Sequence, residues 1–153
     1  MPTAKTVVVG VTGSIAAYKA ADLVSRLVKD GFDVHVIMTD ASQKLVGERT
    51  FLTLSRNPVI TELWELPEWK PGHVSLADKA FAFAVAPATA NFIGKYACGI
   101  ADDALTTYAL SHRGAVLLAP AMNDAMWKHP AVRQNCSTLK SRGVLFVGPA
   151  KGR

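Results

Sequence analysis

The feature that most constrains the fold is a buried-strand pattern followed at once by a glycine-bearing turn and an amphipathic helix. Thr6–Val11 is a short run rich in β-branched residues, typical of a strand buried on both faces. Apolar residues then recur at three- and four-residue spacing over Ile15–Asp30, with Ser14 placed to cap this helix and Gly31 to end it. Phe32–Met38 reads as a second strand. The opening part of the chain therefore predicts a βαβ unit with a right-handed crossover.

The remainder of the chain continues the alternation of strands and helices. Further strands are predicted over Phe81–Pro87, Gly114–Pro120 and Val144–Gly148, and a short one over Pro58–Trp64. Helices are predicted over Thr39–Val46, Glu48–Arg56, Thr89–Cys98, Ala101–Ser111, Met122–Lys128 and Pro130–Arg142, and a loop over Glu65–Gly72. We therefore expect an α/β fold with a doubly wound, mostly parallel, Rossmann-like sheet of about five or six strands, in a single domain over residues 1–153.

Composition excludes several other classes of protein. The chain has 153 residues, of which 50% are hydrophobic and 19% charged, so it is neither disordered nor too short to bury a core. The net charge of +5 is spread without a basic cluster, so no nucleic-acid partner is expected. No apolar run is long enough to span a membrane. Cys98 and Cys136 form no Cys-x-x-Cys pair, and no metal site is expected. A soluble, cytoplasmic protein is the prediction.

Ligands of open parallel sheets bind beyond the carboxyl ends of the strands, where the first glycine-bearing turn, Gly10–Ala16, is expected to lie. A turn that leads into a helix N-terminus presents N–H groups to a phosphate. The spacing is neither that of a dinucleotide fingerprint nor that of a P-loop. Thr39 and Ser42 flank Asp40 after the second strand, and their hydroxyl groups suit a phosphate monoester. Asp40 leaves a dinucleotide as the alternative ligand, because a carboxylate at this place would bind its ribose. The purely structural alternative is a tight turn that binds no ligand.

The segment after the fourth strand, Pro120–Trp127, is the most specific. Asn123, Met126 and Trp127 stand at i, i+3 and i+4, which in a helix would align an amide and two large apolar groups on one face. Asn offers both a donor and an acceptor to a planar carboxylate or amide. The alternative is that the methionines and the tryptophan are ordinary core residues.

His73 is the histidine whose position is least explained by structure, because it follows the Pro/Trp-rich loop. An imidazole has an unperturbed pKa near 6.5, which suits general acid–base chemistry. His35 falls inside a strand, His112 at a helix C-terminus and His129 at a helix entry. The residues alone do not favour catalysis by any single histidine.

Five motifs, taken in order, resemble those of the homo-oligomeric flavin-containing cysteine decarboxylases. They are Val-Thr-Gly-Ser-Ile-Ala-Ala-Tyr-Lys at 11–19, His-Val-Ser-Leu-Ala at 73–77, Ala-Pro-Ala-Thr-Ala-Asn at 86–91, Gly-Ile-Ala-Asp-Asp-Ala-Leu-Thr-Thr at 99–107 and Pro-x-Met-Asn-x-x-Met-Trp at 120–127. The likeness covers roughly residues 6–149, and the last motif is the most diagnostic of the family.

The resemblance implies FMN as cofactor and assigns roles to individual residues. The implied cofactor-binding residues are Gly13, Ser14, Ile15, Thr39 and Ser42 around the phosphate, and Thr89, Ala90 and Asn91 near the flavin ring. His73 would be the active-site histidine. Asn123 would bind the substrate's cysteine carboxylate and take part in catalysis, with Met126 shaping the same pocket.

The activity implied by the resemblance is decarboxylation of a phosphorylated cysteine amide. The likeness is strongest to the branch that acts on 4'-phosphopantothenoylcysteine and yields 4'-phosphopantetheine for coenzyme A biosynthesis. Flavin oxidation of the cysteine side chain to a thioaldehyde creates the electron acceptor for loss of CO2. Family members are trimers or dodecamers with the flavin at subunit contacts, so a homo-oligomer is expected.

The sequence departs from that branch at two places. A clamp with a reducing cysteine is expected beyond the last strand, about where the given sequence reaches Arg153, and Cys98 and Cys136 both fall in earlier helices. Asp78–Phe81 also lacks the Trp-Ala-Asp often seen there. The alternatives are a peptidyl-cysteine decarboxylase that yields an enethiol, a non-catalytic regulatory flavoprotein of the same fold and, more remotely, a nicotinamide-dependent oxidoreductase. The motif at 120–127 and His73 argue against a flavin prenyltransferase.

Overall fold

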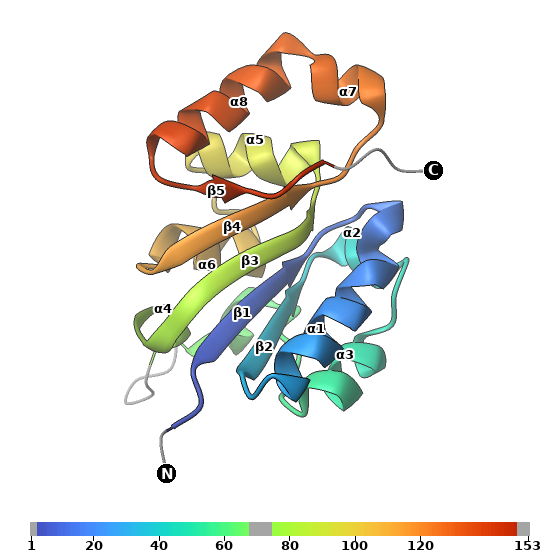
Figure 1. Cartoon of the computed structure of the whole chain (residues 1–153), viewed down its shortest axis with the longest axis vertical. Coiled ribbons are helices and arrows are strands. Elements are labelled where there is room, and N and C mark those ends of the chain that lie inside the picture. The colour runs from blue at the N-terminus through green and yellow to red at the C-terminus, as the bar shows by residue number, and fades with distance from the viewer. Residues whose placement is uncertain (1–2, 68–74, 150–153) are drawn as a thin grey trace.

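Five parallel strands form one sheet in the order β2-β1-β3-β4-β5 in the computed structural model, which describes residues 3–67 and 75–149 (Figure 1). The strands are β1 (Thr6–Val11), β2 (Asp33–Met38), β3 (Ala80–Ala88), β4 (Ala115–Pro120) and β5 (Leu145–Phe146). The expected α/β class and parallel sheet are confirmed.

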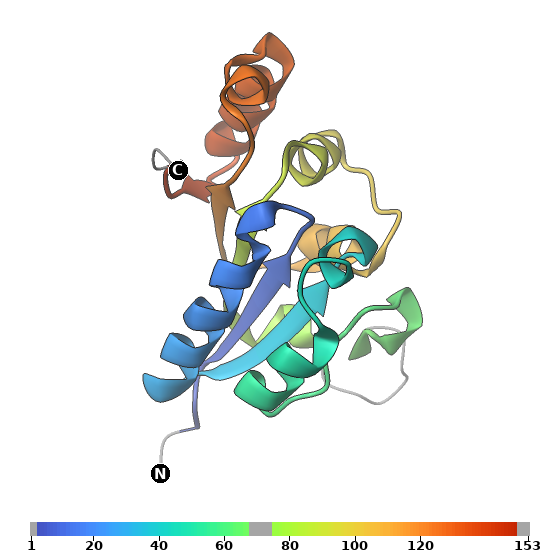
Figure 2. The same ribbon diagram turned by 90° about the vertical axis from the view of Figure 1, so that its right-hand side faces the viewer.

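Helices connect the strands and lie on both faces of the sheet (Figure 2). They are η1 (Ile15–Tyr18), α1 (Lys19–Lys29), α2 (Asp40–Gln43), α3 (Glu48–Ser55), η2 (Leu63–Glu65), α4 (Leu76–Lys79), α5 (Ala90–Cys98), α6 (Ala104–Ser111), α7 (Asp124–Lys128) and α8 (Pro130–Ser141). Within the described ranges no helix has the length and apolar character needed to cross a membrane.

The segment expected as a short strand over Pro58–Trp64 is not one. Only Ile60 pairs with the sheet, through a single bridge to Ile37. Pro58 has no N–H to donate to a ladder. The chain then turns into η2, where Glu62 and Glu65 cap each other's backbone. Local capping thus replaces sheet pairing in this segment.

The helices differ from the prediction at two places. The helix expected over Thr39–Val46 has only the α-helical turn α2, after which the chain winds through a turn toward α3. The short helix α4 was not predicted, and it begins where the Ser75 hydroxyl accepts the N–H of Asp78 at 3.4 Å. Both elements are single turns that depend on their caps, and a hydrophobic periodicity cannot reveal a helix so short.

The β-branched residues of β1 alternate between two apolar layers. Val7, Val9 and Val11 pack against α1 and α3 on one face. Val8 belongs to the larger core on the other face, which contains Phe83 of β3 and side chains from α5, α6 and α8. The central position of β1 therefore explains its continuous apolar run, because both of its faces are covered.

One row of side chains across the sheet shows that helices cover only half of the face on which α1 lies. Val9, Ala84, Leu117 and Leu145 are neighbours in register on β1, β3, β4 and β5. Val9 is fully buried beneath α1, Ala84 and Leu117 are partly exposed, and Leu145 is 56% exposed. Figures 1 and 2 together show α1 beside β2 on the side of the sheet that faces the viewer in Figure 1, whereas no described helix covers β4 and β5 on that side. The β4–β5 half of this face is therefore an open apolar surface.

Candidate functional site

The strand order places a switch point between β1 and β3. The chain passes from β1 to β2 on one side and then returns to β3 on the other side of β1. In open parallel sheets, ligands bind beyond the carboxyl ends of the strands at such a point. The segments after β1, β2, β3 and β4 meet at this edge, and each carries residues that the resemblance implies for cofactor or substrate binding.

Backbone hydrogen bonds join the ends of neighbouring strands at this edge. The N–H of Thr39 after β2 donates to Val11 O of β1 at 3.1 Å. The N–H of Ala121 after β4 donates to Ala88 O of β3 at 3.0 Å. The carboxyl edge is thus a connected rim rather than a set of independent loops.

Gly13 brings the turns after β1 and β2 into contact. A Cβ atom built on Gly13 would lie 2.5 Å from Cβ of Ala41 in α2, a separation that real Cβ atoms do not adopt. Glycine is therefore required for this close approach of two backbones, independently of its dihedral angles. Thr39 is the N-cap of α2, so it lies on the turn that approaches the turn of Gly13 and Ser14.

Three of the predicted phosphate- and flavin-contacting residues are helix caps. The hydroxyl oxygens of Ser14, Thr39 and Thr89 each accept a backbone N–H from the turn that follows, all at 3.2 Å. The expected cap at Ser14 is confirmed. Capping orients each hydroxyl group at the rim and aligns the following turn toward it.

Ser42 and Ile15 lie very differently from each other. Ser42 is fully buried, and its hydroxyl donates to Thr39 O at 2.8 Å, so it orders the turn that holds Thr39. Ile15 is 85% exposed at the start of η1. Ala90 and Asn91 begin α5, where Ala90 packs partly against the core and Asn91 is exposed.

Asn123 is the N-cap of α7 and lies outside the helix proper. Its Oδ1 accepts the N–H of Met126 at 2.9 Å. The helical alignment of Asn123, Met126 and Trp127 on one face is therefore wrong, because Asn123 has extended backbone angles. Met126 is 44% exposed, whereas Trp127 packs against the core and its ring lies 4.1 Å from the Arg133 guanidinium. Trp127 follows the core alternative, and Asn123 keeps its amide N–H groups at the rim.

The histidines other than His73 have structural roles, and His73 lies outside the described residues. His35 Nε2 lies 3.0 Å from Asp33 Oδ2 at the amino end of the sheet. His112 caps α6, and burial lowers the pKa of its imidazole. His129 caps α8 through Nδ1, which accepts a backbone N–H at 3.0 Å.

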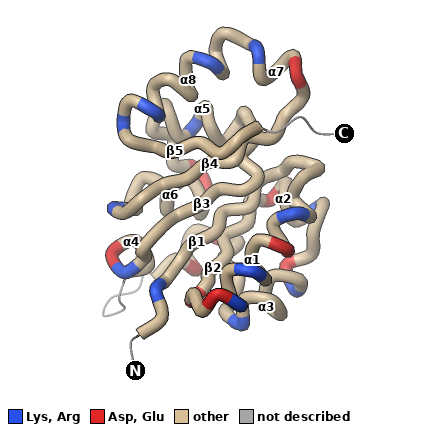
Figure 3. Tube along the Cα trace, viewed as in Figure 1, with Lys and Arg blue, Asp and Glu red and all other residues tan. Residues whose placement is uncertain are grey.

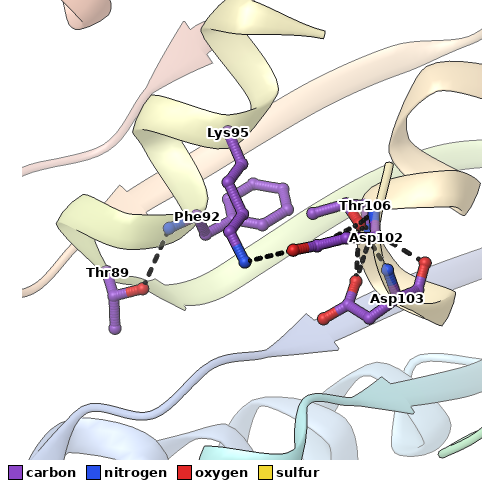
Figure 4. A network of polar contacts seen from close by, with 6 residues as sticks. All are labelled: Thr89, Phe92, Lys95, Asp102, Asp103 and Thr106. Carbon is purple, nitrogen blue, oxygen red and sulfur yellow. Dashed lines mark hydrogen bonds and ion pairs between the residues drawn. The ribbon is translucent and has the colours of Figure 1, made fainter. Parts of the chain in front are cut away.

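The motif at 99–107 connects α5 to α6 (Figure 4). Lys95 Nζ of α5 lies 2.8 Å from Asp102 Oδ2, and this hydrogen bond holds the pKa of Asp102 below its usual value. Asp103 caps α6, where its Oδ1 accepts the Thr106 N–H at 2.8 Å. The motif therefore fixes the C-terminal half of the helix whose N-terminus carries Thr89.

Charged residues are scattered over the helices, with acidic and basic residues interleaved (Figure 3). The four rim segments, residues 10–16, 38–42, 86–91 and 119–127, contain no Lys or Arg. An anion at this rim would therefore be held by N–H and hydroxyl groups and by helix N-termini. Among the described residues no three His, Cys, Asp or Glu side chains come together as a metal site.

Sequence reasoning passed over two residues that shape the rim. Ala41 limits the residue at position 13 to glycine, and Thr12 is buried between the turns after β1 and β3. A threonine directly after an apolar strand, where the backbone must turn, was the available signal for Thr12. Nothing in the sequence alone indicates that Ala41 faces Gly13.

Fold and rim together define an open parallel α/β protein with a ligand site at the β1/β3 switch point. The sequence model of the Flavoprotein family matches residues 1–153. The chain belongs to the flavoprotein family, and the resemblance to flavin-containing cysteine decarboxylases is confirmed.

Individual relatives give the range of this similarity. The chain is 46% identical over 151 residues to the coenzyme A biosynthesis bifunctional protein CoaBC of Bacillus subtilis, covering 97% of this chain and 37% of that protein. The chain thus spans about a third of the length of the curated relatives it matches. The FMN-dependent cysteine decarboxylase SpaF superposes with a TM-score of 0.87 at 31% identity, over 98% of this chain and 87% of the other. A mutant PPC decarboxylase gives a TM-score of 0.81 at 25% identity, over 97% and 88%.

Proposed function

We propose that this chain is an FMN-dependent decarboxylase that acts on the cysteine moiety of 4'-phosphopantothenoylcysteine in coenzyme A biosynthesis. The observation that carries the proposal is the 46% identity to a coenzyme A biosynthesis protein, which extends over nearly the whole chain. The similarity to a PPC decarboxylase structure supports the same substrate. A cytoplasmic location is also part of the proposal.

The rim residues fit the phosphate end of FMN. Gly13 leaves the turn after β1 open to close backbone approach, where a side chain would collide with Ala41. The hydroxyl groups of Ser14 and Thr39 lie on the two turns that meet there. Sheets with the strand order 2-1-3-4-5 bind FMN at the β1/β3 switch point in flavodoxin, which supports the same location here.

The proposed roles follow the positions of the side chains. Gly13, Ser14, Ile15 and Thr39 would hold the phosphate, with Ser42 acting through the turn that it orders. Thr89, Ala90 and Asn91 at the start of α5 would line the flavin ring. Bound FMN would supply the oxidation of the cysteine side chain. That oxidation creates an acceptor for the electron pair that stays behind on the carbon when CO2 leaves.

The substrate end of the site would be formed by the rim after β4. Asn123 has its amide oxygen occupied by the Met126 N–H, so its NH2 group is the part suited to donate to the substrate carboxylate. The exposed Met126 side chain would contact the same substrate. His73 is proposed as the histidine that moves a proton during the reaction.

We propose a homo-oligomer as the working form, as a trimer or dodecamer. The open apolar surface over β4 and β5 supports this, because parallel sheets are stable when both faces are covered. Leu145 and Val147 are 56% and 59% exposed on and just after β5. A second copy of the chain would cover these side chains.

The proposal is tested by incubating the purified protein with FMN and 4'-phosphopantothenoylcysteine and measuring CO2 and products by mass spectrometry. A yellow protein that releases CO2 from this substrate, and not from a peptide ending in cysteine, is the expected result. Release from the peptide alone would favour a peptidyl-cysteine decarboxylase. Bound flavin with no CO2 from either substrate would favour the regulatory flavoprotein, and a colourless protein that FMN does not stabilise would overturn the proposal.

A further inference from the structure

We infer that Thr12 is a positioning residue that locks the two halves of the candidate flavin site to each other. The inference rests on the proposed function, because it concerns the same rim. Thr12 directly follows β1 and precedes Gly13, and the residue is 1% exposed.

The Thr12 hydroxyl makes two hydrogen bonds to the segment that follows β3. It donates to Pro87 O at 2.7 Å and accepts the N–H of Thr89 at 3.0 Å. These partners are 75 and 77 residues away in the sequence. One oxygen atom therefore uses both its donor and its acceptor capacity to bridge the switch point between β1 and β3.

The two turns joined in this way carry different parts of the candidate site. On one side, Ser14 N–H donates to Thr12 O at 2.9 Å, so the backbone of Thr12 also starts the turn proposed to hold the phosphate. On the other side, Thr89 caps α5 and precedes Ala90 and Asn91, which are proposed to line the flavin ring. A shift of one turn relative to the other would misalign the phosphate end and the ring end of a single rigid ligand.

Removal of the hydroxyl group cannot be compensated locally. The Pro87 carbonyl is buried and the Thr89 N–H is partly buried, so loss of their common partner would leave the carbonyl without a hydrogen bond unless the two turns move apart. Serine retains the hydroxyl group, whereas valine matches the shape of threonine without it. The comparison of these two variants separates the hydrogen bonds from the packing.

Thr6 provides a matched control on the same strand. It is also buried, and its hydroxyl donates to Asp33 Oδ2 at 3.2 Å, at the amino end of β1 far from the rim. Thr6→Val therefore removes a buried hydroxyl group from β1 without touching the site. Any effect on stability alone should appear in both variants.

The experiment compares wild type, Thr12→Val, Thr12→Ser and Thr6→Val by FMN titration, visible circular dichroism of bound FMN, and amide hydrogen exchange without FMN. We expect Thr12→Val to weaken FMN binding about tenfold or more and to change the visible circular dichroism of bound FMN. Amide hydrogen exchange should become faster in residues 13–17 and 87–91 together. Thr12→Ser should restore all three properties, and Thr6→Val should leave them unchanged. If Thr12→Val does not fold, Thr12→Cys, which keeps a weak donor of similar size, takes its place.

Two results would overturn the inference. One is wild-type FMN affinity and exchange in Thr12→Val, and the other is equal loss in Thr12→Val and Thr6→Val. If wild-type protein binds no FMN, the proposed function fails, while the exchange measurement still decides whether Thr12 couples the two turns.

Discussion

Gly13 and Ala41 are packed so closely that a methyl group on residue 13 would lie 2.5 Å from the Ala41 Cβ. Gly13→Ala should therefore push apart the turns after β1 and β2, with a loss of about 1–3 kcal/mol in stability and at least about tenfold in FMN affinity. Thermal unfolding and FMN titration measure the two effects. Ala41→Gly in the same chain should restore part of both losses, because it removes the colliding atom.

Gly47 is the control for this substitution. A Cβ on Gly47 would meet nothing within 4 Å, and its φ of −70° suits any residue. Gly47→Ala should change stability by only about 0.5 kcal/mol and leave FMN affinity unchanged. Equal losses at positions 13 and 47 would show that the contact with Ala41 is not the cause.

Asn123 combines a structural and a proposed chemical role that substitutions can separate. Asn123→Asp preserves the cap of α7, but it replaces the amide NH2 with negative charge facing a substrate carboxylate. We expect kcat/KM for 4'-phosphopantothenoylcysteine to fall at least about 100-fold with little change in stability or FMN affinity. Asn123→Ser also keeps the cap and removes the donor without adding charge, so its loss should be smaller. Full activity in Asn123→Asp would exclude the carboxylate contact.

The main strands were predictable because their continuous apolar residues indicate that they are buried. Val7 and Val9 point to one face of the sheet and Val8 to the other, and all three are apolar. A run of apolar residues on both faces is typical of a central strand in a sheet that is covered on both sides. Ile60 lies in an apolar segment as well, yet it makes a single bridge, since the proline before it and the capped turn after it prevent a ladder. In this segment, local hydrogen bonds favour a capped turn over the strand that the hydrophobic pattern predicts.

The rim was predictable in its location and less so in its construction. Ser14 could be placed as a cap because the residue type and the following helix are adjacent in the sequence. The bond from Thr12 to Pro87 joins residues 75 positions apart, so no local pattern reveals it. Asn123 was assigned to a helix face because spacing alone cannot distinguish a cap from a first helical residue.

His73 provides a test of catalysis that is independent of the rim geometry. If it moves a proton during the reaction, His73→Asn should lower kcat about 10²–10⁴-fold while the FMN spectrum and affinity stay the same. His129→Asn is the matched control, because this histidine caps α8 and an asparagine can replace the cap. Stopped-flow release of CO2 measures the rates. Undiminished decarboxylation in His73→Asn would remove this residue from the proposed mechanism.

Leu145 tests whether the open apolar surface joins copies of the chain. A carboxylate buried at an apolar contact is strongly unfavourable, so Leu145→Glu should lower the assembly mass measured by light scattering after size-exclusion chromatography. Leu52→Glu is the control, since Leu52 is 45% exposed on α3 and lies away from β5. A wild-type monomer, or an unchanged mass in Leu145→Glu, would contradict the proposed use of this surface.

Asp33 should make stability depend on pH in the acidic range. Burial alone would raise the pKa of Asp33, but hydrogen bonds from Asn57 and His35 outweigh it and lower the pKa below the usual value. A carboxylate whose pKa is lower in the folded than in the unfolded state stabilises the fold fully above the unfolded pKa of about 3.9. That contribution is lost as the pH falls through the folded value.

Asp33→Asn should therefore cost about 1 kcal/mol at neutral pH, and the difference from wild type should shrink on acidification. Urea unfolding at a series of pH values between neutrality and about pH 3 measures this convergence. Asp22→Asn is the control, because Asp22 pairs with Arg26 on the exposed surface of α1, where an ion pair contributes little. A constant difference between wild type and Asp33→Asn across the series would show that Asn57 and His35 hold the side chain by contacts that do not depend on its charge.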